Sequence, residues 1–208
     1  MKAADPVIFV VDDDPSVRIA LERLIKSVGF RVQTFDTARS VLNAVPCDAP
    51  CCLILDVRMP QMSGLEFQQE MALRGLDMPI IFITGHGTVS MSVRAMKSGA
   101  MDFLEKPFEE QQLLDAIQTA VEKDRQSKQQ KGEMVQIQQR AASLTPREYE
   151  VFKLVVSGKL NKQIADELAA SEKTIKVHRA RVMDKMKAQS LASLVRMAEK
   201  IGIFRVSE

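Results

Sequence analysis

Short apolar runs alternate with helical patterns along the first half of the chain. The runs are residues 7–11, 31–35, 52–55, 80–83 and 101–104. Between them, apolar residues recur three and four positions apart, as Val17, Leu21, Leu24 and Val28 do, which predicts amphipathic helices. Strands that are almost continuously apolar are buried on both faces. The pattern therefore predicts an α/β unit, (βα)5, in which helices cover both sides of a doubly wound parallel sheet.

The second half contains no such run, and its apolar spacing predicts helices alone. Residues 123–143 hold six glutamines and almost no apolar stripe, so we expect a linker. Its residues favour a continuation of the helix that begins at Glu109, with Gly132 as the weakest point. Thr145, Pro146 and Glu148 then form a helix start signal, and further helices are predicted at 162–169, 172–187 and 190–200. The predicted parts are residues 1–122, a linker at 123–143 and an all-α domain at 144–208.

Composition and charge narrow the possible functions. The 208 residues are 46% hydrophobic and 27% charged, as in globular proteins, and no apolar stretch is long enough to span a membrane. The first residues lack the pattern of a secretory signal, which predicts a cytoplasmic protein without a membrane partner. The net charge of +2 divides into −6 for residues 1–122 and +8 for residues 123–208. The basic half favours a nucleic-acid partner, the alternative being a solvated basic surface.

Polar side chains suited to phosphoryl chemistry stand at the carboxyl ends of four predicted strands. They are Asp12, Asp13 and Asp14 after the first, Asp56 after the third, Thr84 at the end of the fourth and Lys106 after the fifth. Ligands of such sheets bind at this edge, and crowded carboxylates favour a hard cation such as Mg²⁺. A carboxylate can then act as the nucleophile that forms an aspartyl phosphate, while the ammonium and hydroxyl groups bind phosphoryl oxygens.

Three residues near these strand ends have structural interpretations. Asp14 precedes Pro15, which suits the first position of a helix, so Asp14 is expected to be the helix cap. Gly64 is expected to supply a turn conformation. Pro107 is expected to shape the backbone after Lys106.

The motifs at these positions resemble the signature of two-component receiver domains. They are Val10-Val11-Asp12-Asp13-Asp14, Leu55-Asp56-Val57-Arg58-Met59-Pro60 with Gly64, Ile83-Thr84-Gly85-His86-Gly87, and Glu105-Lys106-Pro107-Phe108. The Thr84–Gly87 run is similar to the FixJ-type subgroup. The resemblance implies that Asp56 is the phosphoacceptor. It further implies that Mg²⁺ is held by Asp12, Asp13, Asp56 and the backbone carbonyl of Arg58. Thr84 and Lys106 would bind the phosphoryl oxygens.

Two aromatic residues of this region have less specific signals. Phe103 stands where the family has an aromatic switch residue, three positions before Lys106, and a core aromatic on a strand is an equal alternative. His86, two residues after Thr84, is expected to be a loop residue near the site rather than a base.

Residues 162–187 have the pattern of a helix-turn-helix, with Ser171 as the N-cap of the second helix. One face of that second helix is predicted to pack inward through Ile175, Val182, Met183 and Met186. The opposite face carries Lys173, Lys176, Val177, Ala180, Asp184 and Lys187. Such a face can enter a major groove, where its first residues reach base edges and the surrounding cations contact phosphates.

The second half also resembles the LuxR-type DNA-binding domain from residue 144 to about 203. The residues that carry the resemblance are Leu144-Thr145-Pro146-Arg147-Glu148, Gly158, Asn161-Lys162-Gln163-Ile164-Ala165, Leu168, Ser171, Thr174-Ile175-Lys176-Val177-His178 and Lys185. The implied DNA-binding residues are Lys162, Lys173, Thr174, Lys176, Val177, His178, Arg179 and Ala180. Lys176 and Val177 would contact base edges. Ala180 departs from the Lys that is frequent in relatives and suggests an apolar contact with a thymine methyl, and His178 is expected to pack or contact phosphate rather than bind metal.

Together the two resemblances imply a response-regulator transcription factor. A sensor histidine kinase would phosphorylate Asp56, and Thr84 and Phe103 would shift. The face of the fourth helix, fifth strand and fifth helix would then change and favour a homodimer that binds promoter DNA and recruits RNA polymerase, as an activator. Such a protein is not an enzyme, although it can hydrolyse its own phosphoryl group slowly. In the last helix, a stripe of Leu191, Leu194, Val195 and Ala198 is equally a core or a dimer face.

Two alternatives belong to other functional classes. Asp12-x-Asp14 after a first strand also resembles a haloacid-dehalogenase-type phosphatase with Asp12 as nucleophile, but no second acidic pair follows a later strand. The basic half could instead be a protein-interaction module, which salt-dependent DNA binding would exclude.

Overall fold

The computed structural model describes residues 5–45 and 47–203. Five strands form one sheet in the order β2-β1-β3-β4-β5, and each neighbouring pair is parallel. The strands are β1 (Val7–Val11), β2 (Arg31–Phe35), β3 (Cys51–Asp56), β4 (Ile80–Thr84) and β5 (Asp102–Glu105). The predicted (βα)5 sheet is therefore confirmed, with strand ends that move by one residue.

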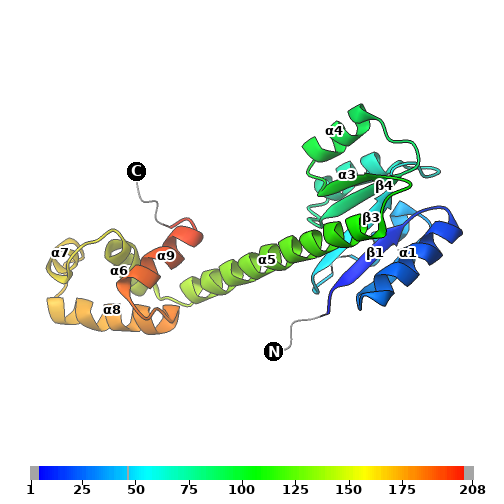
Figure 1. Ribbon diagram of the computed structural model, residues 1–208. Helices are drawn as coiled ribbons and strands as arrows, with labels where there is room; N and C mark the ends of the chain where they lie inside the picture. The colour runs from blue at the N-terminus through cyan, green and yellow to red at the C-terminus, as the bar shows by residue number, and fades with distance from the viewer. Residues whose placement is uncertain (1–4, 46, 204–208) are drawn as a thin grey trace. The chain divides into compact units, whose positions relative to one another are not determined.

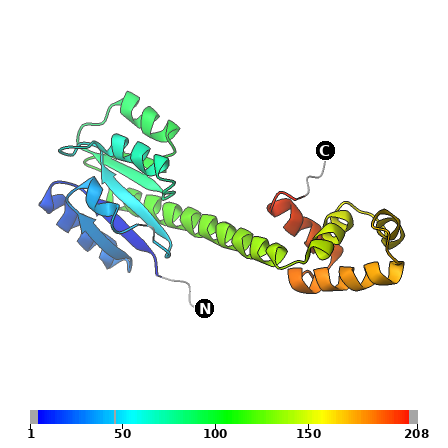
Figure 2. The same cartoon turned by 180° about the vertical axis from the view of Figure 1, so that it is seen from behind.

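Helices cover both faces of this sheet (Figures 1 and 2). One layer contains α1 (Pro15–Ser27) and the first part of α5 (Glu110–Ala142), and the other contains α2 (Ala38–Val41), α3 (Gly64–Leu73) and α4 (Val89–Lys97). Side chains alternate between the layers: Ile8 and Val10 of β1 face α1 and α5, whereas Phe9 and Val11 face the other helices. Burial on both sides explains why β1, β3 and β4 are apolar at nearly every position.

The chain divides into two compact units between Lys128 and Gln129, and α5 contributes residues to both. This helix continues without a break through Gly132, the position expected to be weakest. Its last turns belong to the core of the second unit, where Ile137 and Ala141 are buried. An exposed helix interior tolerates a glycine at a cost of about 1 kcal/mol relative to alanine, which neighbouring helix formers can offset.

The second unit is helical, as predicted. After the end of α5 it contains α6 (Pro146–Val156), α7 (Asn161–Glu167), α8 (Glu172–Met186) and α9 (Leu191–Lys200) around one apolar core. The start signal of α6 is confirmed: the Thr145 hydroxyl accepts from the backbone N–H of Glu148, and the Glu148 carboxylate accepts from that of Thr145. Ser171 caps α8 in the same way, accepting from the N–H of Thr174. None of the helices in the described part of the chain is long and apolar enough to cross a membrane.

Candidate functional site

Three carboxylates meet at the carboxyl edge of the sheet. Because β1 and β3 are neighbours in register, with Val11 opposite Leu55, the next residue of each strand, Asp12 and Asp56, comes to the same place. Asp13 completes the cluster, in which one oxygen of each of the three carboxylates lies within 4.8 Å of the others. Asp12 and Asp56 are buried and Asp13 is exposed.

Lys106 reaches this cluster from the loop after β5. Its Nζ lies 2.7 Å from Oδ2 of Asp12 and 4.0 Å from Oδ2 of Asp56. Its backbone N–H donates to the carbonyl of Thr84 at 2.7 Å, and the peptide bond to Pro107 is cis. The two distances from Nζ show that the ammonium lies beside both buried carboxylates.

The electrostatics of the cluster suit a cation. Burial raises the pKa of the Asp56 carboxyl, the Lys106 ammonium opposes this effect and the Asp12 carboxylate adds to it. One ammonium faces three carboxylates, so negative charge remains in excess among these four groups. A set of carboxylate oxygens at this spacing is compatible with Mg²⁺, which prefers hard oxygen ligands and keeps part of its water shell.

Thr84 and Phe103 lie on the neighbouring strands β4 and β5. Thr84 is fully buried, and its Oγ1 accepts a hydrogen bond from the backbone N–H of His86. His86 is an exposed loop residue, as expected. Phe103 is half-buried, with its ring centroid 6.3 Å from that of Phe82. A Cβ on Gly87 would lie 3.1 Å from the Phe103 ring and 3.4 Å from the Thr84 methyl. Gly87 thus leaves room beside both residues, a role that local sequence signals do not reveal.

Of the structural roles expected for residues near the strand ends, the structure confirms that of Asp14 and corrects that of Gly64. Asp14 is the N-cap of α1, because its carboxylate accepts from the N–H of Ser16 at 2.7 Å. The turn role expected of Gly64 is wrong: it is not in the left-handed region but begins α3 directly after the N-cap Ser63. A Cβ at Gly64 would lie 2.5 Å from the backbone oxygen of Asp56. The glycine is needed for this close approach beneath the end of β3.

The predicted DNA-binding face of α8 is exposed. Ile175, Val182 and Met186 are buried in the core and Met183 is half-buried, which confirms the inward face. The predicted outward residues are all exposed, namely Lys173, Lys176, Val177, Ala180, Asp184 and Lys187, and so are Lys162 and Thr174.

Two other predicted DNA-binding residues, Arg179 and His178, are partly buried within the second unit. Arg179 donates to the side chain of Asn161 at 3.1 Å, which ties α8 to α7. His178 is half-buried, and within the described part of the chain its Nδ1 has no hydrogen-bond partner. Packing is therefore part of the environment of both side chains.

The apolar stripe of α9 is divided between two environments. Leu194 and Ala198 are completely buried in the core of the second unit. Val195 is half-buried and Leu191 is exposed. The core explanation of this stripe therefore accounts for two of its four residues.

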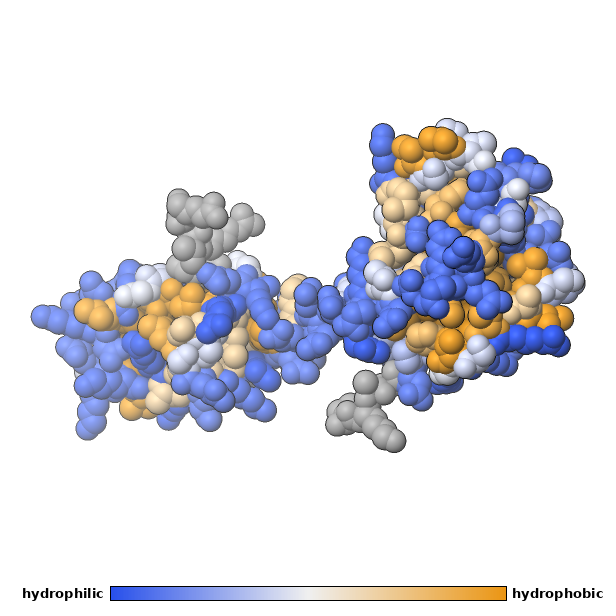
Figure 3. Space-filling model, in the orientation of Figure 1, coloured by the Kyte–Doolittle hydropathy of each residue, from blue (hydrophilic) through white to orange (hydrophobic). Residues whose placement is uncertain are grey.

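A further apolar stripe is exposed on α4. Val89, Val93 and Met96 lie at helical spacing on one side of it, and Val89 is 82% exposed. Figure 3 shows this patch in orange over α4. Exposed apolar residues that cluster in this way are typical of interaction surfaces.

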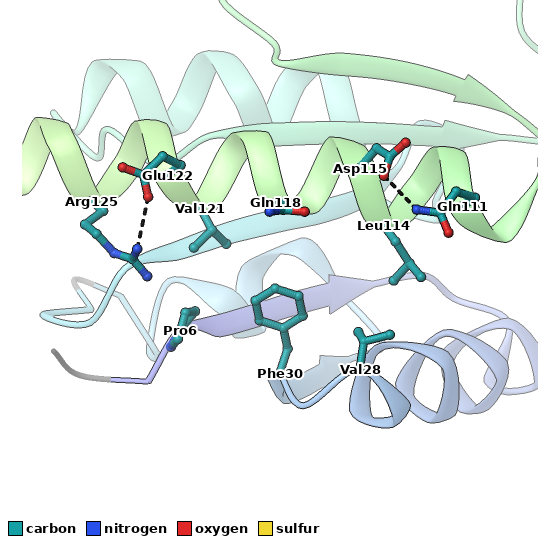
Figure 4. Close-up of a pocket in the computed structure, with 10 residues that line it drawn as sticks. All are labelled: Pro6, Val28, Phe30, Gln111, Leu114, Asp115, Gln118, Val121, Glu122 and Arg125. Carbon is teal, nitrogen blue, oxygen red and sulfur yellow. Dashed lines mark hydrogen bonds and ion pairs between the residues drawn. The ribbon is translucent and has the colours of Figure 1, made fainter. Parts of the chain in front are cut away.

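A groove of about 530 Å³ lies between α5 and the segment that joins α1 to β2 (Figure 4). Val28, Phe30 and Leu114 line its apolar part. Its polar side includes the ion pair of Glu122 with Arg125 and a hydrogen bond from Gln111 to Asp115. None of the strand-end residues described above lines this groove, so it is separate from the acidic site.

With this geometry established, comparisons define the class of protein. Residues 8–118 match the response regulator receiver domain, and residues 142–198 match the LuxR family of bacterial regulatory proteins. The chain belongs to the FixJ-type response regulators, which join a receiver domain to a LuxR-type helix-turn-helix domain and regulate transcription. The phosphatase alternative is not favoured by this architecture.

Particular relatives cover almost the whole chain. It is 48% identical to response regulator protein TmoT of Ectopseudomonas mendocina over 97% of this chain and 91% of that protein. It is 43% identical to transcriptional regulatory protein FixJ of Bradyrhizobium diazoefficiens, over 94% of this chain and 96% of that protein. Among solved structures, it is similar to the response regulator StyR, with 48% identity, a TM-score of 0.87, and coverage of 95% of this chain and 100% of that one.

Proposed function

We propose that a sensor histidine kinase transfers a phosphoryl group to Asp56, and that this modification controls dimerisation and promoter binding. The observation that carries the proposal is the meeting of three carboxylates within 4.8 Å, with the Lys106 ammonium 4.0 Å from Asp56. In the transfer, an Asp56 carboxylate oxygen forms a bond to phosphorus as the phosphorus–nitrogen bond of the phosphohistidine breaks. The imidazole leaves with its electron pair and takes up a proton.

Each residue of the site has a defined part in this step. Lys106 and the Thr84 hydroxyl would bind oxygens of the incoming phosphoryl group. Asp12, Asp13, Asp56 and the backbone carbonyl of Arg58 would hold Mg²⁺, which when bound supplies positive charge to phosphoryl oxygens. The chain would act as a regulator and not as an enzyme on other substrates, with slow hydrolysis of its own aspartyl phosphate.

The response to phosphorylation would pass through Thr84 and Phe103 to the face formed by α4, β5 and α5. A bound phosphoryl group can shift a population only by binding one state better than the other, and Thr84 contacts would supply that difference. The exposed stripe of Val89, Val93 and Met96 supports a homodimer interface on this face. On α9, the exposed Leu191 and the half-buried Val195 would form a second dimer contact, while Leu194 and Ala198 are buried in the core.

In the second unit, α8 would enter the major groove of promoter DNA. Lys176 and Val177 would contact base edges, and Ala180 a thymine methyl. Phosphate contacts would come from Lys162, Lys173, Thr174, His178 and Arg179. The bound dimer would recruit RNA polymerase in the cytoplasm and activate transcription. We retain residues 1–122, 123–143 and 144–208 as the proposed functional parts, and the exposure of the α8 face supports the assignment of DNA binding to the last.

The decisive experiment measures DNA affinity with and without a small phosphodonor and Mg²⁺. The probe is a duplex selected from a random-sequence library by the phosphodonor-treated wild-type chain, and fluorescence anisotropy reports binding. Treatment is expected to strengthen binding by about tenfold, within the usual range of coupling between two sites. Asp56→Asn should remove this increase, and Asp36→Asn, which alters an exposed carboxylate just after β2, should preserve it. Full stimulation of Asp56→Asn would overturn the proposal.

A further inference from the structure

A cluster of polar groups fastens α5 to the edge of the sheet opposite the acidic site. Asp124 of α5 is only 2% exposed, and its Oδ2 accepts from the backbone N–H of Cys51 at 2.7 Å. The same oxygen lies 2.7 Å from Nζ of Lys128, one helical turn further on. Lys128 also donates to the carbonyl of Ala49 at 2.7 Å and to Sγ of Cys51 at 3.3 Å. We call these four residues the α5 anchor.

The α5 anchor differs from the exposed pair of Arg125 and Glu122 on the same helix. A buried carboxylate is costly unless it is paired and hydrogen-bonded, and Asp124 has both a cation and a backbone N–H. The Arg125–Glu122 pair lies on the same helix but is exposed at both ends, where ion pairs contribute about 0–1 kcal/mol. The predicted linker begins at residue 123, and nothing in its polar sequence distinguishes Asp124 from the solvated charges around it.

The chemistry of the α5 anchor is structural and not redox. Burial raises the pKa of the Cys51 thiol to about 12, and Asp124 adds to the effect. The thiol therefore stays neutral and unreactive at physiological pH. Burial opposes the charge of Lys128, but the hydrogen bonds and charge interactions of Lys128 with Asp124 and Cys51 together outweigh this effect and raise the pKa of the ammonium. The Lys128 ammonium therefore keeps its charge in the neutral range, 2.7 Å from Oδ2 of Asp124.

The position of the α5 anchor connects two functional parts of the chain. Cys51 is the first residue of β3 and Asp56 is the last, so the anchor and the proposed phosphoacceptor stand at opposite ends of one strand. Every residue of β3 is buried, and the strand lies between β1 and β4, so a closely packed core connects the two ends. Lys128 is also the last residue of the first compact unit, beyond which α5 continues to Ala142.

We propose that Asp124 and Lys128 are positioning residues for signal output: they fix the rotation and axial position of α5 against β3 where the helix leaves the receiver unit. A conformational change in the receiver unit then moves α5 as one rigid helix, so that the linker part of the helix moves with the receiver part. Without the anchor, the last turns of the receiver part of α5 would move independently of the sheet. The inference rests on the proposed function, because the signal it transmits is phosphorylation of Asp56.

The test compares anchor variants of the full chain in the DNA-binding assay with and without phosphodonor. Asp124→Ala and Lys128→Gln are expected to reduce the stimulation of DNA binding by about three- to tenfold, which lies within the range of coupling changes at intermediate residues. Phosphoryl uptake at Asp56 and binding without phosphodonor should stay unchanged. Lys128→Arg, which retains the cation, should restore the stimulation. Arg125→Gln, which breaks the exposed pair on the same helix, is the matched control and should equal wild type.

A second readout separates this role from general damage to the fold. Backbone amides of residues 125–135 should exchange hydrogen faster in Asp124→Ala and Lys128→Gln, while those of β3 and β4 keep their protection. If the buried Asp124→Ala does not fold, Lys128→Gln decides, since the Lys128 side chain is already 30% exposed. Wild-type stimulation in folded anchor variants would overturn the inference, and so would a loss of phosphoryl uptake. A wild-type chain that shows no stimulation would instead overturn the proposed function.

Discussion

At the scale of single residues, the backbone at Gly64 packs closely against the backbone oxygen of Asp56. Gly64 lies directly beneath the end of β3, and the Gly64 N–H donates to the carbonyl of Val57 at 2.9 Å. The position of the Asp56 carboxylate therefore depends on a residue eight positions later in the chain. This dependence can be tested without touching the acidic residues.

Gly64→Ala is expected to destabilise the receiver unit by about 1–3 kcal/mol, as overpacked substitutions commonly do. The added Cβ would lie 2.5 Å from the Asp56 carbonyl oxygen, so the backbone must move, and phosphoryl uptake should slow. Urea unfolding and phosphodonor labelling measure the two effects. Gly132→Ala is the control: open space surrounds that position in α5, and the change should stabilise the helix. An unaltered Gly64→Ala would contradict this explanation.

Glu148 provides a residue-scale prediction of pH dependence in the second unit. Its buried carboxylate accepts from Lys185 at 2.6 Å and from Thr145, which lowers its pKa from 4.5 to about 2. A lowered pKa contributes stability that is present above pH 4.5 and is lost as the pH falls towards 2. The advantage of wild type over Glu148→Gln should therefore shrink in that interval.

Tyrosine fluorescence can follow this transition in the full chain. Tyr149 is the only tyrosine, there is no tryptophan, and Tyr149 lies in α6 beside Glu148. Thermal unfolding monitored at this residue reports on the second unit alone. A stability difference between Glu148→Gln and wild type that is constant from pH 7 to pH 2 would contradict the assigned ion pair.

At the scale of secondary-structure elements, α4 and α8 differ in the chemistry of the side chains that they expose to solvent. The outward face of α8 is mainly charged, with Val177 and Ala180 as small apolar interruptions, as a DNA-reading face requires. The outward face of α4 is apolar at Val89, Val93 and Met96. Each helix therefore presents the surface that its proposed partner would bury.

Val89→Asp in α4 is expected to weaken phosphodonor-dependent dimerisation by about tenfold or more, since about 1.4 kcal/mol at an interface centre has this effect. Sedimentation velocity with and without phosphodonor measures the change. Leu73→Asp is the matched control, because Leu73 is 89% exposed at the end of α3, outside the proposed face. Equal effects of the two substitutions would argue against an interface on α4.

At the scale of the whole molecule, charge is divided between the two halves. Residues 1–122 carry −6 and residues 123–208 carry +8, so attraction to DNA belongs to the second half. The acidic half instead concentrates its buried carboxylates at one sheet edge. The near-neutral total charge therefore describes neither half of the chain.

Salt dependence tests this division. Lys173→Ala should weaken binding to all DNA sequences alike and reduce the slope of log affinity against log salt concentration by about 0.9, the value for one phosphate contact. Val177→Ala should alter sequence preference with little change in the slope. Lys26→Ala, in the receiver helix α1, is the control and should change neither. A slope unaffected by Lys173→Ala would remove that residue from the proposed phosphate contacts.

Sequence alone determined the order of the elements and the candidate site, because these depend on local periodicity and on the residues directly after each strand. Apolar runs located the ends of all five strands within one residue, and start signals such as Thr145–Glu148 placed the beginnings of helices. The acidic residues were identifiable because every strand of a parallel sheet ends at the same edge. The continuous α5 also followed from its good helix formers, although not its passage through Gly132.

Only the tertiary structure decided which residues meet across long distances in the chain. Gly64 is required by a close approach to Asp56 and not by its own backbone angles, so no local signal could distinguish the two. Asp124 contacts Cys51 across 73 positions, and Leu194 and Ala198 are buried by helices that precede α9. Local patterns record the preferences of a residue and its near neighbours, whereas burial and long-range pairing depend on how distant elements pack.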